Sequence, residues 1–328
     1  MDALAKGRME IVHFGSACRD IAPDDPRGWR LGGGVTYAAL TTARLGLRTA
    51  AVIGLDEAAA DAPEVELLRA AGVEVLAVPL SEGPVFHNVE SAEGRVQTCV
   101  ATGVPLPTVE LPGAWREARA WSFTPVAGEI RDAWSAAIPR GSFVVVGWQG
   151  FLRSLVPGER VGRIPPRRSA LLERADLVGV SHHDLDPATS LADLCRWLKP
   201  GADLLVTRGS QGGLLVRVGV ERAEQVVRYL PSRARELDPT GAGDTFLAAL
   251  SASVLRPAIA GLRRSRRSPD LRFAAAAGSL AVEAVGLAGV PDRAAVNLRR
   301  AHETIRRAVT PTLESQVGDY TVGSDEET

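Results

Sequence analysis

The stretch Leu237-Asp238-Pro239-Thr240-Gly241-Ala242-Gly243-Asp244-Thr245-Phe246 governs the interpretation of the whole chain. Two glycines flank one alanine, so the backbone can turn tightly there and lie close to a ligand. Phe246, Leu250 and Val254 then recur at helical spacing, which predicts a helix that buries one stripe. A glycine turn that opens a helix presents free N–H groups and the positive end of the helix dipole. The stretch therefore predicts a site for an anion such as a phosphoryl group.

Asp244 stands in the first turn of that predicted helix, where its negative charge would repel a phosphate. A carboxylate in this place can take a proton from an attacking hydroxyl group. The alternative is that Asp244 only caps the helix, as aspartate often does. For a Gly-Ala-Gly-Asp sequence by itself, capping is the better interpretation.

The whole string from Asp238 to Phe246 closely resembles the C-terminal signature of the PfkB, or ribokinase-like, carbohydrate kinases. The resemblance implies an anion hole formed by the backbone of Gly241, Ala242 and Gly243. It also implies that Asp244 is the catalytic base, and that ATP and Mg²⁺ are cofactors. A requirement for a monovalent cation such as K⁺ stays open.

The bulk composition fits a globular chain without an electrostatic preference for nucleic acid. Of 328 residues, 45% are hydrophobic, which is enough for a sizeable core, and the formal net charge is −1. The basic run from Arg263 to Arg267 is predicted to be a solvated loop. Cys18, Cys99 and Cys195 are widely spaced, which argues against a disulfide framework and favours a reducing compartment.

No apolar run reaches the length of about 20 residues that spans a bilayer, and the start lacks the regions of a signal peptide. We therefore expect a cytoplasmic protein whose partners are ATP and a small-molecule substrate, with no nucleic acid or membrane partner. A homodimer stays open. Residues 1–318 are expected to form one kinase domain, and the polar, acidic segment 319–328 a disordered tail.

The N-terminal part carries a predicted strand, Glu10 to Gly15, and the expected acceptor-binding residues. The resemblance implies that Asp20, just after this strand, binds substrate hydroxyls through its carboxylate. Without the resemblance, a surface-turn aspartate is the preferred interpretation. A glycine run then precedes a predicted helix that ends at Gly46. Here the resemblance implies that Gly32 and Gly33 form the hinge and the substrate floor.

Tyr37 departs from the family pattern. Many sugar kinases of the family place an Asn five residues after the first glycine, where it binds sugar hydroxyls, and Tyr37 is the aligned residue here. A phenol can give one hydrogen bond to a substrate, but it is bulky. Tyr37 therefore stands as a substrate-binding candidate and leaves a ribose-like or fructose-like specificity unsettled.

Two alternating segments, 84–90 and 95–100, are joined by turn residues and predict a hairpin. Both of its faces are mixed, which suits a small sheet covering a cleft, and the family places its lid there. We therefore expect a lid built from segments near 15–34 and 84–101, with Asn88 facing the substrate. An ordinary sheet edge is the alternative.

From Trp121 onward, apolar runs without alternation predict strands buried on both faces of a parallel sheet. These runs are residues 120–123, 143–148, 176–180 and 203–207. Segments 127–138 and 191–198 are predicted to be crossover helices. The predicted class is α/β, and the resemblance implies a ribokinase-like three-layer sandwich with a mostly parallel central sheet and a small β lid.

Three further segments follow strand ends, where sites gather in such sheets. The family usually has Asn-x-x-Glu where this chain has Ser181 to Asp184, so the resemblance implies that Asp184 holds Mg²⁺ through water. A metal site on the adjacent histidines is disfavoured, because neighbouring side chains diverge. Arg153 follows another strand, where it could approach a phosphate, but a solvated arginine is the preferred interpretation. The third segment resembles Thr-x-Gly-x-x-Gly, which implies that Thr207, Gly209 and Gly212 bind ATP, and the resemblance of the signature stretch adds Thr240.

The sequence therefore predicts an ATP-dependent kinase that phosphorylates a hydroxyl of a small polyol. A sugar or a cyclitol such as inositol is the first choice. The sequence pattern that leads to Asp20 and the aromatic residue Tyr37 are similar to those of inositol kinases of the family. A nucleoside kinase is the alternative, and a catalytically silent binding protein is the second alternative. The sequence has no Gly-x-x-x-x-Gly-Lys-Ser/Thr loop and no Gly-x-Gly-x-x-Gly after the first strand, which disfavours P-loop enzymes and dinucleotide oxidoreductases.

Overall fold

The computed structural model describes residues 8–91, 94–220, 223–261, 269–302 and 308–309. Three sequence predictions lie outside these residues and are not described further: the basic run 263–267, the tail 319–328 and the tip of the hairpin at 92–93. No helix in the described part of the chain is long and apolar enough to cross a membrane.

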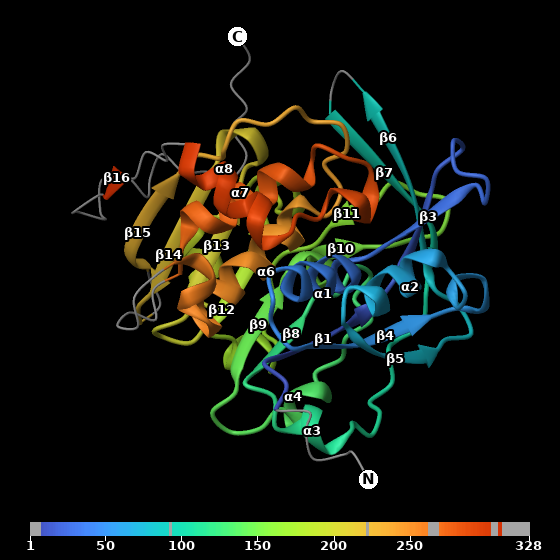
Figure 1. Ribbon diagram of the computed structural model, residues 1–328, viewed down its shortest axis with the longest axis horizontal. Coiled ribbons are helices and arrows are strands. Elements are labelled where there is room, and N and C mark those ends of the chain that lie inside the picture. The colour runs from blue at the N-terminus through green and yellow to red at the C-terminus, as the bar shows by residue number, and fades with distance from the viewer. Residues whose placement is uncertain (1–7, 92–93, 221–222, 262–268, 303–307, 310–328) are drawn as a thin grey trace.

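Ten of the described strands form one central sheet (Figure 1). In sheet order they are β16 (Ala308–Val309), β15 (Ala223–Tyr229), β14 (Gly213–Val218), β13 (Asp203–Thr207), β12 (Leu177–Ser181), β9 (Phe143–Gly147), β8 (Ala120–Phe123), β1 (Ile11–Ser16), β4 (Thr49–Leu55) and β5 (Glu74–Pro79). All neighbours from β13 to β5 pair in parallel, while β14, β15 and β16 add antiparallel pairs. The predicted mostly parallel sheet is confirmed.

A second, four-stranded sheet has the order β3-β2-β6-β7. Its strands are β3 (Trp29–Gly32), β2 (Cys18–Ile21), β6 (Pro84–Ser91) and β7 (Gly94–Thr102). We call it the small sheet. A two-stranded ribbon pairs β10 (Arg153–Ser154) with β11 (Gly162–Arg163). The small sheet contains the predicted hairpin, β6 and β7, and pairs β6 with β2 from a distant segment of the sequence.

Helices cover both faces of the central sheet and complete the three layers. They are α1 (Gly34–Arg44), α2 (Pro63–Ala70), α3 (Gly113–Arg116), α4 (Trp134–Ala137), α5 (Leu191–Cys195), α6 (Ala242–Leu255), α7 (Leu271–Ala281) and α8 (Arg293–His302). Figure 1 shows α1, α6 and α7 lying in front of the sheet. Side chains of α6 and α7 pack in one cluster with Val145, while Val144 and Val146 pack on the other side with α3, α4 and α5. This alternation along β9 is what a strand buried on both faces requires.

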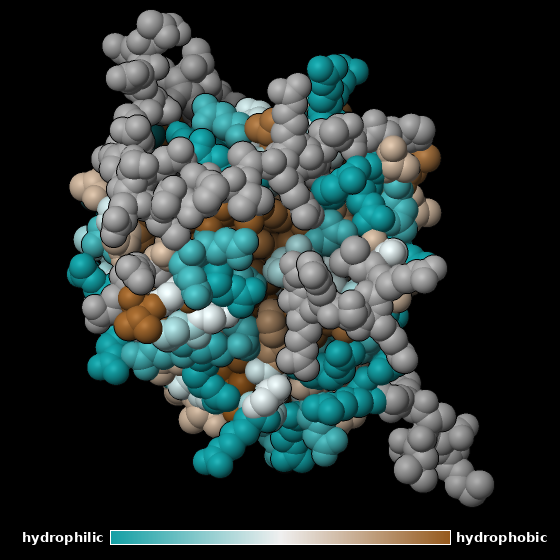
Figure 2. Space-filling model, turned by 90° about the vertical axis from the view of Figure 1, so that its left-hand side faces the viewer, coloured by the Kyte–Doolittle hydropathy of each residue, from teal (hydrophilic) through white to brown (hydrophobic). Residues whose placement is uncertain are grey.

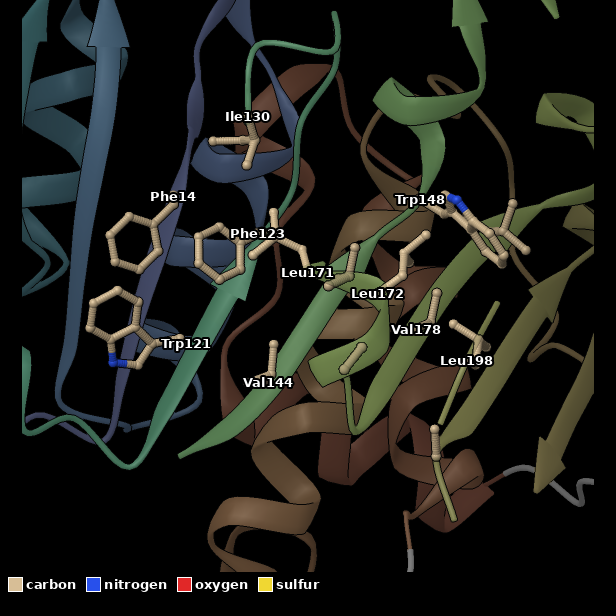
Figure 3. Packing of buried hydrophobic residues seen from close by; sticks show 14 of the residues in the cluster. Phe14, Trp121, Phe123, Ile130, Val144, Trp148, Leu171, Leu172, Val178 and Leu198 are labelled. Carbon is tan, nitrogen blue, oxygen red and sulfur yellow. The ribbon is translucent and has the colours of Figure 1, made fainter. Parts of the chain in front are cut away.

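The core on the second face is rich in aromatic rings (Figure 3). The ring of Phe14 on β1 stacks on Trp121 at 4.7 Å and on Phe123 at 4.9 Å between centroids, both on β8. Trp134 of α4 contacts the same ring at 4.9 Å. Such pairs contribute about 0.5–1.5 kcal/mol each beyond their buried area. They fix the relative position of β1 and β8, whose carboxyl ends border the candidate site.

The predicted helix 127–138 is wrong except for its last turn, α4. Gly128 has a left-handed φ of 68°, which a regular helix does not contain. The buried carboxylate of Glu129 accepts the backbone N–H groups of Ser16, Val126 and Ala127 at 3.0, 3.1 and 2.8 Å. These bonds hold residues 125–129 as a loop against the end of β1, because a buried carboxylate needs such partners.

The side of the molecule that carries β15 and α8 shows hydrophobic residues between hydrophilic ones (Figure 2). Val220 and Leu230 are the large apolar residues exposed next to β14 and β15, at 76% and 46%. Single exposed apolar residues of this kind are normal on protein surfaces. We attach no function to this face.

Candidate active site

The N-terminus of α6 is built on a glycine turn. Gly241 is the N-cap and has a left-handed φ of 75°. A Cβ on Gly241 would lie 2.1 Å from Cδ1 of Tyr37, so both the backbone and the neighbouring ring require glycine. Gly243 is different, because no atom lies within 4 Å of a Cβ placed there and its φ is not left-handed. The backbone beside Gly243 therefore borders open space that a ligand can enter.

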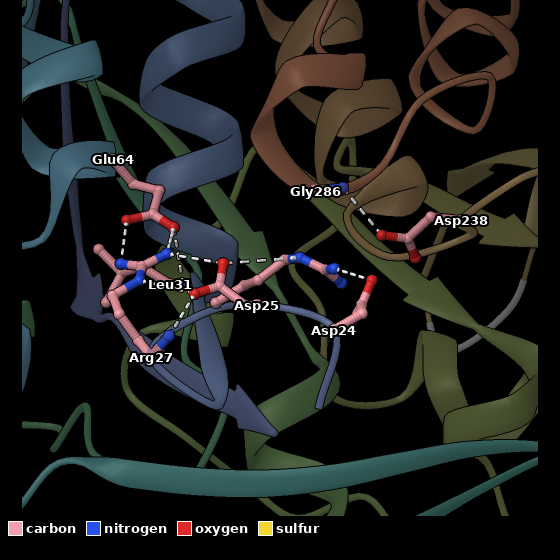
Figure 4. A network of polar contacts seen from close by, with 8 residues as sticks. Asp24, Asp25, Arg27, Leu31, Glu64, Asp238 and Gly286 are labelled. Atoms are coloured by element: carbon pink, nitrogen blue, oxygen red, sulfur yellow. Dashed lines mark hydrogen bonds and ion pairs between the residues drawn. The ribbon is translucent and has the colours of Figure 1, made fainter. Parts of the chain in front are cut away.

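The carboxylate of Asp238 holds this turn in place. Its Oδ1 accepts the backbone N–H of Thr240 at 2.9 Å. Its Oδ2 accepts the backbone N–H of Gly286 at 2.9 Å (Figure 4). The backbone N–H of Leu237 donates to the carbonyl of Val282 at 2.7 Å. These bonds attach the turn to the segment that follows α7, 48 residues later in the chain. The predicted ATP-binding residue Thr240 thus lies on a fixed turn.

Asp244 is the third residue of α6, and the N-cap position belongs to Gly241. A Cβ on Gly34 would lie 2.8 Å from Oδ1 of Asp244, so this carboxylate packs against the start of α1. Burial, and next the negative charge of Asp184, raise the pKa of Asp244 from 3.8 to about 7, while Arg153 acts in the opposite direction. A carboxyl group with a pKa near neutrality is suited to accept a proton at physiological pH.

The small sheet presents the predicted acceptor-binding residues on one face. Asn88 donates through Nδ2 to Oδ1 of Asp20 at 3.1 Å, and Nε2 of Gln97 donates to Oδ1 of Asn88 at 2.7 Å. Asp20 lies opposite Phe86 in the sheet register, and Phe86 lies opposite Cys99, so these side chains share that face. Gln97 was not predicted from the sequence, but its place across the hairpin from Asn88 was a usable signal.

Both N-terminal glycines have structural reasons to lack a side chain. A Cβ on Gly32 would lie 2.4 Å from Oδ2 of Asp20, so the carboxylate of Asp20 occupies the space over Gly32. Gly33 has a φ of 104°, and a Cβ there would lie 2.8 Å from the carbonyl oxygen of Ser16. The structure therefore brings Gly32 and Asp20 together at the edge between the small sheet and α1.

Tyr37 lies between the two sides of the site. Its ring is 2% exposed and packs on Gly241. Its pKa is raised well above 10.0, first by burial and then by the negative charges of Asp238 and Asp20. One phenol thus contacts the glycine turn and is within electrostatic reach of the acceptor residue Asp20.

The other predicted ATP-binding residues surround the end of β13. Gly212 has a φ of 86°, and a Cβ there would lie 2.1 Å from the carbonyl oxygen of Tyr229. Gly209 has a φ of 51° and open space around it. The carbonyl oxygen of Thr207 is 3.2 Å from Nδ1 of His182, which links this turn to the segment after β12. The turn geometry by itself accounts for both glycines.

Asp184 accepts a hydrogen bond from Nε2 of Gln149 at 3.1 Å and lies 3.9 Å from Nη2 of Arg153. The rings of His182 and His183 contact each other at 3.8 Å between centroids. Within the described residues, no group of three or more His, Cys, Asp or Glu side chains could hold a metal ion. Mg²⁺ often binds through one or two carboxylates together with substrate phosphates and water, and Asp184 offers an oxygen ligand of that kind.

The interpretation of Arg153 as a solvated arginine is wrong. Its side chain is 10% exposed, Nη1 donates to the carbonyl of Val126 at 2.9 Å, and the guanidinium lies 5.4 Å from the centroid of the Phe86 ring. Arg153 begins β10, after a short 3-10 helix that follows β9. Its position just beyond a parallel strand is the sequence feature that indicates this place in the site.

Comparisons with known proteins agree with this fold and this signature. Residues 165–293 match the model described as pfkB family carbohydrate kinase. Among solved structures, an Arabidopsis thaliana ribokinase complexed with ribose and ATP has a TM-score of 0.63 and 22% identity. That match covers 90% of this chain and 100% of the ribokinase. The matched residues include Asp238–Phe246, so the family recognised in this signature is confirmed, and the whole chain shares the ribokinase-like fold.

Two further structures share the fold at low identity. A pyrophosphate-dependent kinase in the ribokinase family, complexed with a pyrophosphate analogue and myo-inositol, has a TM-score of 0.63, 20% identity and coverage of 87% and 98% of the two chains. A Methanocaldococcus jannaschii nucleoside kinase has a TM-score of 0.63, 16% identity and coverage of 91% and 100%. The predicted fold class is confirmed by these likenesses.

A curated relative matches a shorter segment. The bifunctional protein HldE of Pseudomonas putida is 39% identical over 133 residues, which is 40% of this chain and 24% of that protein. The matched segment therefore spans about a quarter of that relative's length. Segments of the same protein from other Pseudomonas strains match at 41–44% identity.

Proposed function

We propose that this protein is an ATP-dependent kinase that transfers a phosphoryl group to a hydroxyl of a small polyol, a sugar or an inositol-like cyclitol. The observation that carries the proposal is the environment of Asp244. Its carboxylate has a pKa of about 7, lies at the N-terminus of α6 beside the open backbone of Gly243, and packs against the start of α1.

In the proposed reaction, the acceptor hydroxyl attacks the terminal phosphorus of ATP in line, and Asp244 takes the hydroxyl proton. A new oxygen–phosphorus bond forms, the bond to the bridging oxygen breaks, and ADP leaves. The N–H groups at Gly241 and Gly243 and the helix dipole stabilise the negative charge that develops on the transferred group. The N–H of Ala242, the third predicted member of the anion hole, donates to the carbonyl of Pro239 at 3.3 Å in this structure. Mg²⁺, held with the ATP phosphates and through water by Asp184, would neutralise phosphate charge.

The acceptor side favours a polyol. Asp20, Asn88 and Gln97 form a connected polar cluster on one face of the small sheet. A carboxylate and two amides can each exchange hydrogen bonds with neighbouring hydroxyl groups. The fold-level likeness to a kinase solved with myo-inositol agrees with the inositol-like choice but does not decide it.

The donor side favours a nucleotide. Leu237 and Val285, 56% and 44% exposed, immediately precede Asp238 and Gly286, which are bonded to each other. Exposed apolar side chains beside a phosphate site suit an adenine base, which inorganic pyrophosphate lacks. We therefore propose ATP as the donor, although one structural neighbour is described as pyrophosphate-dependent.

The nucleoside kinase alternative requires space for a base at the acceptor site. Phe86 is the aromatic side chain on that face of the small sheet, and its ring is already in contact with the guanidinium of Arg153. If the protein is instead a catalytically silent binding protein, the raised pKa of Asp244 would have no catalytic role.

A donor–acceptor matrix tests the proposal. Purified protein is incubated with ATP or pyrophosphate against ribose, fructose, myo-inositol and other inositols, adenosine and inosine, and consumption of the donor is measured. We expect turnover with ATP and at least one sugar or inositol. Turnover with nucleosides alone would favour the nucleoside kinase alternative. Absence of turnover with every donor–acceptor pair would favour a catalytically silent binding protein.

A further inference from the structure

Arg153 is held at the meeting point of three elements. Its Nη1 donates to the carbonyl of Val126 in the loop after β8, and its Nη2 lies 3.9 Å from Oδ1 of Asp184 after β12. Its guanidinium also lies on the ring of Phe86 in the small sheet. Arg153 therefore stands where the acceptor side and the carboxyl ends of the central strands come together.

The charge of Arg153 reaches the reacting groups. It opposes the upward shift in the pKa of Asp244, and it has the same effect on the thiols of Cys18 and Cys99 in the small sheet. Asp184 and Asp244 bring two carboxylates into the same region, and the charge of Asp184 acts on Asp244. A phosphoryl group that enters there needs a cation to offset this repulsion.

Most of the donor capacity of Arg153 is unused. A guanidinium has five N–H groups, and the hydrogen bond to Val126 uses one of them. The 3.9 Å separation from Asp184 is too long for a hydrogen bond. Among the described residues, Nε and Nη2 of Arg153 have no hydrogen-bond acceptor at bonding distance. A nearly buried guanidinium with spare donors in a fork is suited to bind the oxygens of a phosphoryl group.

We propose that Arg153 is a catalytic residue that binds the terminal phosphoryl group of the donor during its transfer. The inference rests on the proposed kinase function and adds a residue to it. Arg153 donates to the non-bridging oxygens while the acceptor oxygen bonds to phosphorus and ADP departs.

The competing explanation is structural. Arg153 could serve only to bind the carbonyl of Val126 and to pack on the ring of Phe86. Its loss would then weaken the packing of the small sheet against the loop that contains Val126. Such a role predicts lower thermal stability and weaker acceptor binding. It predicts no preference between donors that differ only in the terminal phosphoryl group, and this difference makes the two explanations separable.

The test compares two nucleotides by titration calorimetry: ADP, which lacks the transferred group, and the β,γ-imido analogue of ATP, which carries an inert form of it. The variants are Arg153→Met and Arg153→Lys. Arg174→Met is the matched control, because Arg174 also donates to main-chain carbonyls, those of Ser135, Ile138 and Pro139, before β9. Melting curves establish that each variant is folded.

We expect Arg153→Met to weaken binding of the imido analogue by about tenfold or more, as loss of a hydrogen bond to a charged group does, and to leave ADP binding unchanged. Turnover in the donor–acceptor matrix should fall roughly 10²–10³-fold. Arg153→Lys should recover part of both losses, and Arg174→Met should match the parent.

Equal effects on ADP and the imido analogue, or turnover within about threefold of the parent, would overturn the role of Arg153. If the parent binds both nucleotides but phosphorylates no acceptor, the proposed function fails. The comparison of ADP with the imido analogue still decides whether Arg153 binds the terminal phosphoryl group. If the parent binds neither nucleotide, ATP is not the donor, and both proposals fall together.

Discussion

The carboxylate of Asp244 occupies the space that a side chain on Gly34 would need: a Cβ on Gly34 would lie 2.8 Å from Oδ1 of Asp244. The two residues are the first and third positions of different helices, α1 and α6. The absence of a side chain at Gly34 therefore makes room for the proposed base. The same Cβ would lie 2.9 Å from the carbonyl oxygen of Thr124, so the contact has no spare volume.

Gly34→Ala should displace Asp244 and lower kcat by roughly 10–10²-fold, because small misplacements of a reacting group cost that much. The fold should persist with a stability loss of about 1–3 kcal/mol, as overpacking does. Gly113→Ala is the control, since the nearest atom to its Cβ would be 3.9 Å away and its φ is not left-handed. Unchanged kcat in a folded Gly34→Ala protein would show that the packing of Asp244 against Gly34 is not needed for catalysis.

Gly32→Ala should act on acceptor binding. Its Cβ would lie 2.4 Å from Oδ2 of Asp20, so the carboxylate must leave its place beside Asn88. We expect the acceptor KM to rise about tenfold or more, since hydrogen bonds to a charged group are lost, and the ATP KM to stay unchanged. Initial rates with each substrate varied in turn measure both constants. A rise in the ATP KM alone would place Asp20 outside the acceptor site.

Asp184→Ala should raise the Mg²⁺ concentration needed for half-maximal rate, and excess Mg²⁺ should restore part of the activity. Asp184→Glu, which returns the usual family residue, should retain or improve activity. If Asp184 serves only the local structure through Gln149, the variant loses about 1 kcal/mol of stability and its Mg²⁺ requirement does not move. A Mg²⁺ titration of both variants, beside their melting curves, separates these outcomes.

Asp244 should also make stability depend on pH. Its pKa is raised in the folded protein from 3.8 to about 7, so between these values the folded state binds more protons than the unfolded state. The free energy of unfolding therefore loses a contribution as pH rises through this window. Asp244→Asn removes the ionisation, so its Tm relative to the parent should rise from about pH 4 to about pH 7 and then level. A Tm difference that is independent of pH would contradict the raised pKa.

The parallel strands could be predicted because their signal is local. The run Asp203–Thr207 was predicted as a strand and is β13 with the same bounds. The segment 127–138 failed because its conformation depends on Glu129, whose carboxylate binds the distant backbone of Ser16. Such a contact leaves no periodic trace in the sequence, so a helical pattern was the only available guide.

The same distinction applies to the site. Asp244 and the glycine turn lie within one short stretch, so the sequence indicates them together. Arg153 reaches Val126, Asp184 and Phe86 from different parts of the chain. Its burial depends on the order of strands β8, β9 and β12 in the sheet and on the position of the small sheet above them. That order is set by tertiary packing, and a single sequence does not display it.

The most direct test of the central claim is the turnover of Asp244→Asn, measured with ATP and the acceptor found in the donor–acceptor matrix. The substitution keeps the shape of the side chain and removes its ability to accept the proton. The account predicts that kcat falls by roughly 10²–10⁴-fold while ATP binds as it does to the parent. In the parent, kcat/KM should fall below about pH 7, where Asp244 becomes protonated. Near-normal turnover by a folded Asp244→Asn protein would contradict the assignment of Asp244 as the base.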